Sequence, residues 1–421
     1  MTPDMRVGLI VAVGALFVHP AGAIGQSNST ERTLPTQQQL SRFGLERAWW
    51  GQATLNKNRD KVRHVSIDEE MVFVLSTSGL ITAFESETGK HRWALLLGRH
   101  DEPGYPVVSN EKLAMVVIGS SLYAIDKRSG QIVWTLDLPA QASTSPGVDE
   151  NQVYVGMLDG SVYAYSLRKI RMLYQEQRLP EWTAEAMVWR AAANEEITSP
   201  PISNGRTVSF CSRDGSLYSV ATANKQLKYQ LETNGPILAP LATTGKVNFL
   251  ASEDNTFFAL DATNGRILWD FTTGLPIRRP PFVFGNDLFI TPERGGLFCL
   301  NAGNGTIRWK QPGLKSFVAL IHDAIFASDV DGNLVRVGRE EGGITAALSM
   351  RNFSIRVAND RTDRIFMSTE SGLVIALRSR GETIPVYHKF PDRLPILPEI
   401  QPEIPEPPAA DPGADTGSDA K

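Results

Sequence analysis

Acidic and histidine side chains are the groups in this chain that could bind a metal ion. The run Asp329-Val330-Asp331-Gly332-Asn333, with Glu340 after it, resembles a calcium loop in its spacing of carboxylates. Its glycine is the fourth residue, whereas a calcium loop needs glycine at the sixth. The six histidines show neither paired spacing nor an HExxH motif. We therefore interpret the acidic run as a tight turn and predict no metal ligand.

The possible nucleophiles show no catalytic arrangement either. The chain lacks the sequence fingerprints of serine hydrolases and of nucleotide-binding loops. Cys211 and Cys299 lie in apolar stretches, and the repeat described below places them two units apart, too far for a disulfide bond. We expect two buried free thiols, and we predict no catalytic and no cofactor-binding residue.

Three arginines are the better candidates for recognising another molecule. Arg278 and Arg279 stand between prolines, and Arg294 precedes two glycines. Proline and glycine mark such segments as connections, and loops held on a rigid scaffold commonly bind partners. The overall charge, 42 Lys+Arg against 46 Asp+Glu, gives no general attraction for nucleic acid. We therefore predict that Arg278, Arg279 and Arg294 bind a partner that is not a nucleic acid.

The elements that must position these arginines follow from an internal repeat. A small residue is followed after six positions by glycine and after ten by tryptophan, as in Ala124, Gly130 and Trp134. The register recurs about every 40 residues, at Ala83, Ala124, Ala164, Ser219, Ala259, Cys299, Arg336 and Ala376. This period fits one blade of a β-propeller. We predict an all-β, eight-bladed propeller of four-stranded antiparallel blades over residues 41–390.

The aromatic residues of the repeat are expected to be structural. Indole rings that lie flat between adjacent blades would bury a large apolar area, and glycine would form the turn before each of them. We assign this blade-docking role to Trp93, Trp134, Trp189, Tyr229, Trp269, Trp309, Gly89, Gly130, Gly265 and Gly305.

The interval between Ala164 and Ser219 is longer than the others by an insertion. Within about residues 168–183, Ile170, Leu173 and Tyr174 continue a helical spacing that begins at Leu167. We predict a short helical insertion in blade three, and Pro180 should end that helix.

Two segments could supply the outer strand of the eighth blade. One is Ile384 to Phe390, and the other is Glu46 to Leu55, which contains Trp49 and Trp50. Either would cover the open sheet edge and close the ring. We favour Ile384 to Phe390.

The two ends of the chain differ in composition from the repeats. Residues 1–23 have the apolar run and small-residue cleavage pattern of a signal peptide. Residues 24–40 are polar and predict a flexible linker, and residues 391–421 predict a disordered, acidic, proline-rich tail. We expect an exported protein, in the periplasm or at the outer-membrane periphery, with no transmembrane segment in the mature chain.

The repeated pattern of a small residue, an apolar residue and an acid, then glycine and tryptophan, resembles the docking repeat of the quinoprotein-like (PQQ-like repeat) propeller family. Over about residues 60–390 the chain is most similar to the BamB-like secreted members. This resemblance implies a monomeric, non-catalytic scaffold that binds another envelope protein, with a possible role in outer-membrane protein assembly.

The same family offers two alternatives. One is a quinoprotein dehydrogenase that uses pyrroloquinoline quinone (PQQ) with calcium. The alcohol-oxidising dehydrogenases carry two adjacent cysteines, and this chain has no such pair. The other is a propeller that binds a small envelope ligand, such as a glycan.

Overall fold

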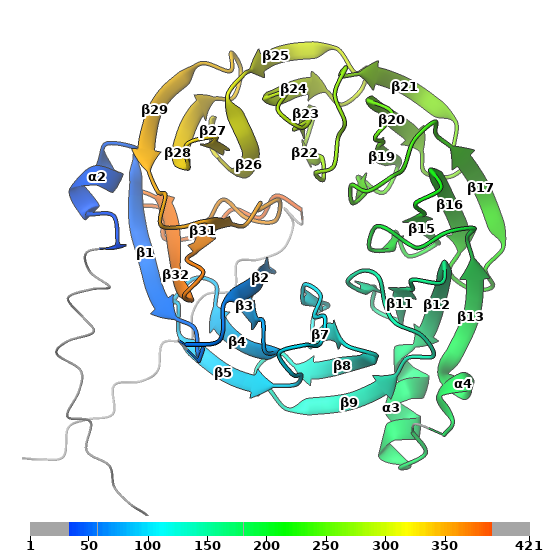
Figure 1. Ribbon diagram of the computed structural model, residues 1–421. Helices are drawn as coiled ribbons and strands as arrows, with labels where there is room; N and C mark the ends of the chain where they lie inside the picture. Colours follow the sequence, from blue (N-terminus) through cyan, green and yellow to red (C-terminus); the bar gives the residue numbers. More distant parts are fainter. Residues whose placement is uncertain (1–32, 57, 180, 390–421) are drawn as a thin grey trace, which may run out of the picture.

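Eight four-stranded antiparallel sheets form a closed ring in the computed structural model, which describes residues 33–56, 58–179 and 181–389 (Figure 1). The predicted fold class, an all-β propeller with eight blades, is confirmed. Each strand is short, and the second strand of each blade is buried along most of its length, because neighbouring blades stack against one another. The core is therefore a set of apolar layers between blades, such as the layer that contains Phe73, Val116 and Trp93.

The first four blades follow one another along the chain. Blade one contains β2 (Val62–Ile67), β3 (Met71–Ser76), β4 (Leu80–Glu85) and β5 (His91–Leu96). Blade two contains β6 (Val108–Ser109), β7 (Leu113–Ile118), β8 (Ser121–Asp126) and β9 (Ile132–Asp137). Blade three contains β10 (Gly147–Val148), β11 (Gln152–Gly156), β12 (Ser161–Ser166) and β13 (Met187–Ala192). Blade four contains β14 (Ile202–Ser203), β15 (Thr207–Cys211), β16 (Ser216–Ala221) and β17 (Leu227–Glu232).

The remaining blades complete the circle. Blade five contains β18 (Ala242–Thr243), β19 (Val247–Ala251), β20 (Thr256–Asp261) and β21 (Ile267–Thr272). Blade six contains β22 (Phe282–Phe284), β23 (Asp287–Ile290), β24 (Leu297–Asn301) and β25 (Ile307–Gln311). Blade seven contains β26 (Leu314–Ile321), β27 (Ala324–Asp329), β28 (Asn333–Gly338) and β29 (Ile344–Ser349). Blade eight contains β30 (Ile355–Arg356), β31 (Ile365–Ser368), β32 (Leu373–Ser379) and, as its outer strand, β1 (Leu45–Gln52).

The sequence repeat corresponds to one cross-strand pair in every blade. The small residue of the third strand lies opposite the aromatic residue of the outer strand, as Ala124 lies opposite Trp134. The same pairing joins Ala83 with Trp93, Ala164 with Trp189, Ser219 with Tyr229, Ala259 with Trp269, Cys299 with Trp309 and Ala376 with Trp49. Blade seven is the exception, because Arg336 lies opposite Ala346 at this register. A small residue leaves room for the indole on the same face of the sheet.

Five of the docking indoles also bind the next blade. The Nε1 of Trp93 donates a hydrogen bond to the carbonyl oxygen of Lys127 at 2.8 Å. Gly130 of blade two lies against the same ring, because a Cβ atom at this position would come within 2.4 Å of the Trp93 Cγ. The indole bond recurs from Trp49 to Ser86, Trp189 to Thr222, Trp269 to Ala302 and Trp309 to Arg339. The glycine contact recurs at Gly89, Gly265, Gly305 and Gly342.

Three junctions depart from this arrangement, and in blade seven Ala346 stands at the position of the aromatic residue. Trp134 is buried beside the helical insertion, in one apolar cluster with Leu167 and Ile170 of α3. In blade four, Tyr229 takes the place of tryptophan, and its hydroxyl accepts a hydrogen bond from the Asn248 side chain at 2.9 Å.

The insertion consists of two short helices on the outside of blade three. Helix α3 (Leu167–Gln175) begins at Ser166, whose hydroxyl accepts from the Lys169 N–H, and α4 (Thr183–Ala186) leads into β13. Leu167, Ile170 and Leu173 form its buried face, whereas Tyr174 is 39% exposed. The predicted helical insertion is confirmed, although α3 ends at Gln175, before Pro180.

The ring closes differently from our expectation. Closure by Ile384 to Phe390 is wrong, because the N-terminal strand β1 pairs with β32 along seven residue pairs. The reason lies in the docking register. Trp49 stands opposite Ala376 and reaches Ser86 of blade one at 2.7 Å, which gives the eighth blade the indole that its own C-terminal segment lacks.

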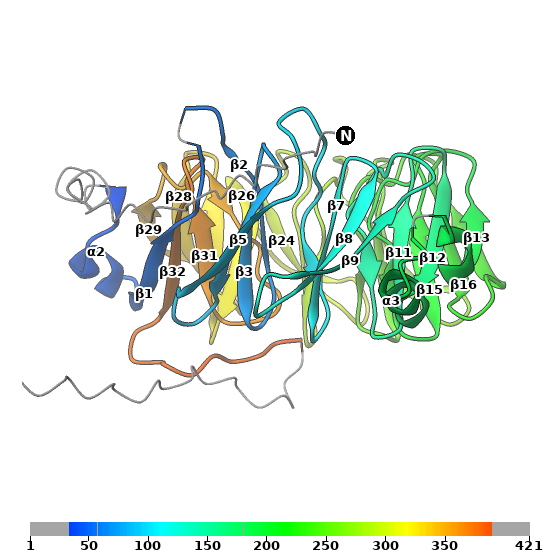
Figure 2. The same ribbon diagram turned by 90° about the horizontal axis from the view of Figure 1, so that it is seen from below.

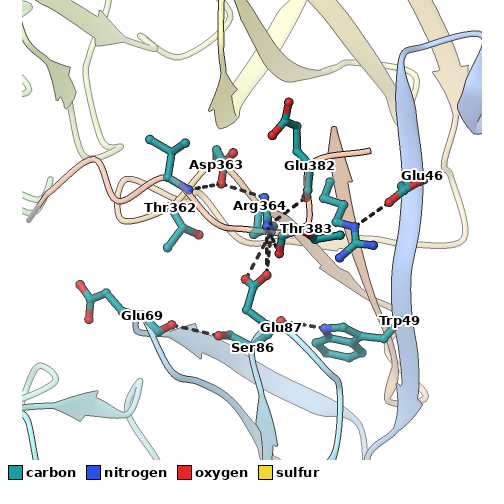
Figure 3. A network of polar contacts seen from close by, with 12 residues as sticks. Glu46, Trp49, Glu69, Ser86, Glu87, Thr362, Asp363, Arg364, Glu382 and Thr383 are labelled. Carbon is teal, nitrogen blue, oxygen red and sulfur yellow. Dashed lines mark hydrogen bonds and ion pairs between the residues drawn. The ribbon is translucent and has the colours of Figure 1, made fainter. Parts of the chain in front are cut away.

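A buried network reinforces this junction between blades eight and one (Figure 3). Arg364 is 1% exposed at its side chain and pairs with Glu87 at 3.0 Å and with Asp363 at 2.9 Å. Its guanidinium also lies 3.4 Å from the carbonyl oxygens of Glu382 and Thr383. These carboxylates and carbonyls around one planar cation fix the position of the blade-eight loop against the turn that carries Glu87.

The segment before β1 is also packed. Helix α2 (Gln37–Ser41) has a capping box in which Thr36 and Gln39 bond reciprocally. Leu34 and Leu40 are buried against residues of blades seven and eight. This end of the predicted linker 24–40 is therefore ordered structure, and the predicted flexible linker is wrong here. The predicted signal peptide and proline-rich tail lie outside the described residues.

The two faces of the ring carry different connections. In Figure 2, the upper face carries the turns between second and third strands and the connections between successive blades. The lower face carries the remaining turns and residues 382–389, here called the C-terminal strap, which Figure 1 shows running inward from the rim. No helix in the described parts of the chain combines the length and the apolar character needed to traverse a bilayer.

The C-terminal strap is held by blades six, seven and eight. The Val386 N–H donates to the Asp363 carboxylate at 2.9 Å, and the His388 N–H donates to the Arg361 carbonyl at 2.8 Å. The His388 ring bonds the Leu320 carbonyl at 2.9 Å and meets Phe284 edge-on. The strap therefore ends beside the inner strands of blades six and seven.

Candidate partner-binding cleft

The three arginines singled out in the sequence lie together in one cleft of about 450 Å³ on the upper face. They come from two different connections of blade six, and the cleft lies where blade six meets blade seven. Its wall is completed by residues that the sequence did not single out. The lining side chains include Arg278, Arg279, Glu293, Arg294, Lys315 and Val330.

The cleft exists because one connection between blades is short. Residues 273–281 join blade five to blade six, whereas only Pro312 and Gly313 join β25 to β26. A connection of two residues leaves little chain to lie over the junction of blades six and seven, and the cleft opens there.

A strained turn places one of the arginines. Arg294 has a φ of +57°, a backbone conformation that disfavours side chains other than glycine or asparagine. The following Gly296 packs so closely on blade six that a Cβ would come within 2.3 Å of the Gln311 carbonyl oxygen. The turn is thus pressed against the outer strand, and Arg294 is left exposed at the rim of the cleft. Backbone strain of this kind costs on the order of 1 kcal/mol and is often found at binding sites.

The charges of the cleft are only partly balanced. Arg278 forms ion pairs with Glu253 and, at 3.0 Å, with Glu293. Hydrogen bonding to Glu253 raises the pKa of Arg278 above its usual value. Arg279 instead donates to the backbone carbonyl of Lys315 at 2.7 Å, which neutralises no charge.

Three cations therefore keep their charge available for a ligand. Within the described residues, no acidic side chain is ion-paired with Arg279, Arg294 or Lys315. Guanidinium groups form paired hydrogen bonds with carboxylates, so the cleft is suited to acidic side chains or a chain terminus. Val330, at the edge of the cleft, is 71% exposed and offers an apolar contact beside the charged side chains.

The sequence contained a signal for the missed residues. The register interval between Cys299 and Arg336 is shorter than the 40 residues that separate most units. This deficit is the shortened connection Pro312–Gly313, which exposes Lys315 and Val330. The shortened interval between Cys299 and Arg336 therefore indicates the junction of blades six and seven, where the cleft lies.

The other chemical candidates fall into structural roles. Asp329 accepts from the backbone N–H of Asn333 at 2.7 Å, so the acidic run is a hairpin turn as predicted. Cys211 and Cys299 are buried free thiols in different blades, which confirms that expectation. Across residues 33–389, apart from the two positions left undescribed, no three acidic, histidine or cysteine groups converge as a metal site would require.

One family of known proteins matches this chain over most of its length. The sequence profile of the family described as outer membrane protein assembly factor BamB matches residues 77–186 and 182–380. A search of curated proteins finds no match.

Solved structures share the fold at low sequence identity. BamB from Moraxella catarrhalis superposes with a TM-score of 0.62 at 15% identity, covering 79% of this chain and 99% of that one. The computationally designed Ika8 protein gives a TM-score of 0.61 at 13% identity, with coverage of 77% and 99%. Sqt1 from Saccharomyces cerevisiae gives 0.58 at 14% identity, with coverage of 77% and 98%. These likenesses show the propeller fold.

Proposed function

We propose that this chain, which belongs to the family described as outer membrane protein assembly factor BamB, is a non-catalytic scaffold that binds another protein of the cell envelope. The partner docks on the upper face, with acidic groups in the cleft between blades six and seven. The family name states a role in the assembly of outer-membrane proteins, and we extend that role to this chain. The chain would perform it in the periplasm, as an exported, monomeric propeller. No cofactor takes part in it.

One observation carries the proposal. Arg279, Arg294 and Lys315 are brought to one open junction on a rigid ring that fixes their relative positions, and the acidic side chain that lines the same cleft, Glu293, is ion-paired with Arg278. Cations that served only solubility would be spread over the surface with acids between them. A fixed group of cations in a concave site is what recognition of an acidic partner requires.

The test is capture of envelope proteins with charge-reversed variants. The full chain, the double variant Arg279→Glu/Arg294→Glu and the control Arg168→Glu/Arg171→Glu are immobilised and exposed to a detergent extract of the cell envelope. The control arginines are exposed on α3, away from the cleft, and the reversal changes net charge equally.

We expect one or more proteins that the wild type and the control retain and that the cleft variant loses at least tenfold. Loss of the same proteins from the control would mean that overall charge, and not the cleft, determines binding. Retention by the cleft variant would place the docking surface elsewhere on the ring.

A further inference from the structure

The cleft has a candidate occupant within its own chain. Residues 390–421 contain seven carboxylate side chains and two cationic ones, and they follow directly on the C-terminal strap. The acids are Asp392, Glu399, Glu403, Glu406, Asp411, Asp415 and Asp419. Their charge is opposite to the net charge of the cleft lining, in which four cationic side chains face one acidic side chain, Glu293, and Glu293 is ion-paired with Arg278.

The strap delivers this segment to the same blade junction as the cleft. His388 bonds the carbonyl of Leu320 near the lower end of β26, and Leu314 and Lys315 at the upper end of β26 line the cleft. Lys315 and Leu320 are five residues apart on β26, which at about 3.3 Å per residue is roughly 17 Å. An extended chain of the length of residues 390–421 reaches about 100 Å. The segment is therefore several times longer than the separation along β26 between the end of the strap and the cleft.

The composition of the segment lowers the cost of docking. Pro398, Pro402 and Pro405 each precede a glutamate, and the ring of proline fixes the backbone angle φ before any contact is made. Less conformational entropy is then lost on binding. Attachment to the same chain adds an effective concentration in the millimolar range, so that weak ionic contacts suffice.

We propose that residues 390–421 dock in the upper-face cleft of their own chain, with their glutamates on Arg279, Arg294 and Lys315. Docking of the segment stands independently of any partner. If the proposed function also holds, the segment and the partner compete for one site, and the segment sets the threshold affinity that a partner must exceed.

Lys315 allows a direct test, because a carbodiimide joins a lysine amine to a carboxylate only when the two are in contact. The full chain is treated at low micromolar concentration and the linked peptides are identified by mass spectrometry. The exposed Lys169 on α3 serves as the reference lysine. We expect Lys315 to be linked to tail glutamates, within monomers, at least fivefold more often than Lys169.

The variant Arg279→Glu/Arg294→Glu should remove this preference, and so should 0.5 M salt, because the contacts are ionic. Equal linkage of the tail to Lys169 and Lys315 would overturn the proposal. Linkage to Lys315 found only in dimers would overturn docking within one chain. Partner capture is measured separately with Glu399, Glu403 and Glu406 all changed to Gln. Failure to capture a partner would refute the proposed function and leave the cross-link result intact.

Discussion

Replacing Gly130 by alanine perturbs the contact that repeats around the ring. A new Cβ would lie 2.4 Å from the Cγ of Trp93 and 2.7 Å from its Cβ. These atoms are next to the Trp93 backbone, so the indole cannot swing aside without moving β5. Two costs add: about 1 kcal/mol because alanine disfavours the φ of +73°, and roughly 1–3 kcal/mol for overpacking. We expect a total loss of about 2–4 kcal/mol.

The matched control is Gly205→Ala, and the measurement is denaturant unfolding followed by intrinsic fluorescence. Gly205 has a φ of +84° in a turn, and nothing lies within 4 Å of the added Cβ. This variant should lose only the conformational term, about 1 kcal/mol. The comparison therefore isolates the contact with Trp93. A second check uses Trp93→Ala, in which Gly130→Ala should cost less than in the wild type, because the contacts with the ring are gone and only the 2.7 Å contact with the Cβ of residue 93 remains.

Equal losses at Gly130 and Gly205 would refute the reasoning. The same conclusion would follow if Gly130→Ala cost as much with Trp93 removed as with Trp93 present. Either result would mean that the glycines are needed for their backbone conformation alone, and that close packing of glycine on indole does not hold adjacent blades together.

Three further predictions concern closure and buried groups. Trp49→Ala should lower the unfolding free energy by about 3–5 kcal/mol, whereas Trp50→Ala on the same strand, at a side chain 45% exposed, should change it by less than about 0.5 kcal/mol; equal effects in thermal denaturation would contradict the docking role. Burial raises the pKa of Glu87, so its contribution to stability is present at low pH and is lost as pH rises through its folded-state pKa. Between pH 4 and pH 7 the unfolding free energy of the wild type should therefore fall relative to that of Glu87→Gln. The opposite trend would show that attraction to Arg364 outweighs burial. Burial raises the pKa of Cys211 and Cys299 to about 12, so a thiol reagent at pH 8 should label neither in the native protein and both after denaturation; rapid native labelling would show that the blades open.

The architecture could be predicted because the docking pairs are local in sequence. Ala124 and Trp134 are ten residues apart and meet across one hairpin, so spacing alone reports their contact. The same spacing in successive units indicated the number of blades. Glycine at the turn and indole on the outer strand are chemically specific enough that few other folds would need both.

Ring closure could not be chosen in this way, because β1 and β32 are distant in sequence. Trp49 and Ala376 are separated by most of the chain, and no local spacing relates them. The sequence argued only against the C-terminal segment as the outer strand, because Val386 stands where the eighth unit would need its indole. Two apolar segments of similar length competed for the edge, and only the position of the aromatic ring distinguishes them.

The cleft was foreseen in part. Proline and glycine identified Arg278, Arg279 and Arg294 as loop residues, but nothing in their spacing indicated that the loops meet. They meet because the ring brings the connections before and within blade six to one face, beside the short Pro312–Gly313 link. Lys315 lies on a strand and carried no loop signal, so reasoning from turns alone could not include it.

The pairing of β1 with β32 also fixes the order of events during synthesis. β1 precedes the other described strands in the chain, and it finds its partner only when β32 has been made. Until then, β1 and its indole have no sheet to join, and the last blade presents a bare edge that other chains could pair with. The nascent protein therefore needs either a holding factor or rapid completion, and truncation near the C-terminus should yield aggregates and not a seven-bladed ring.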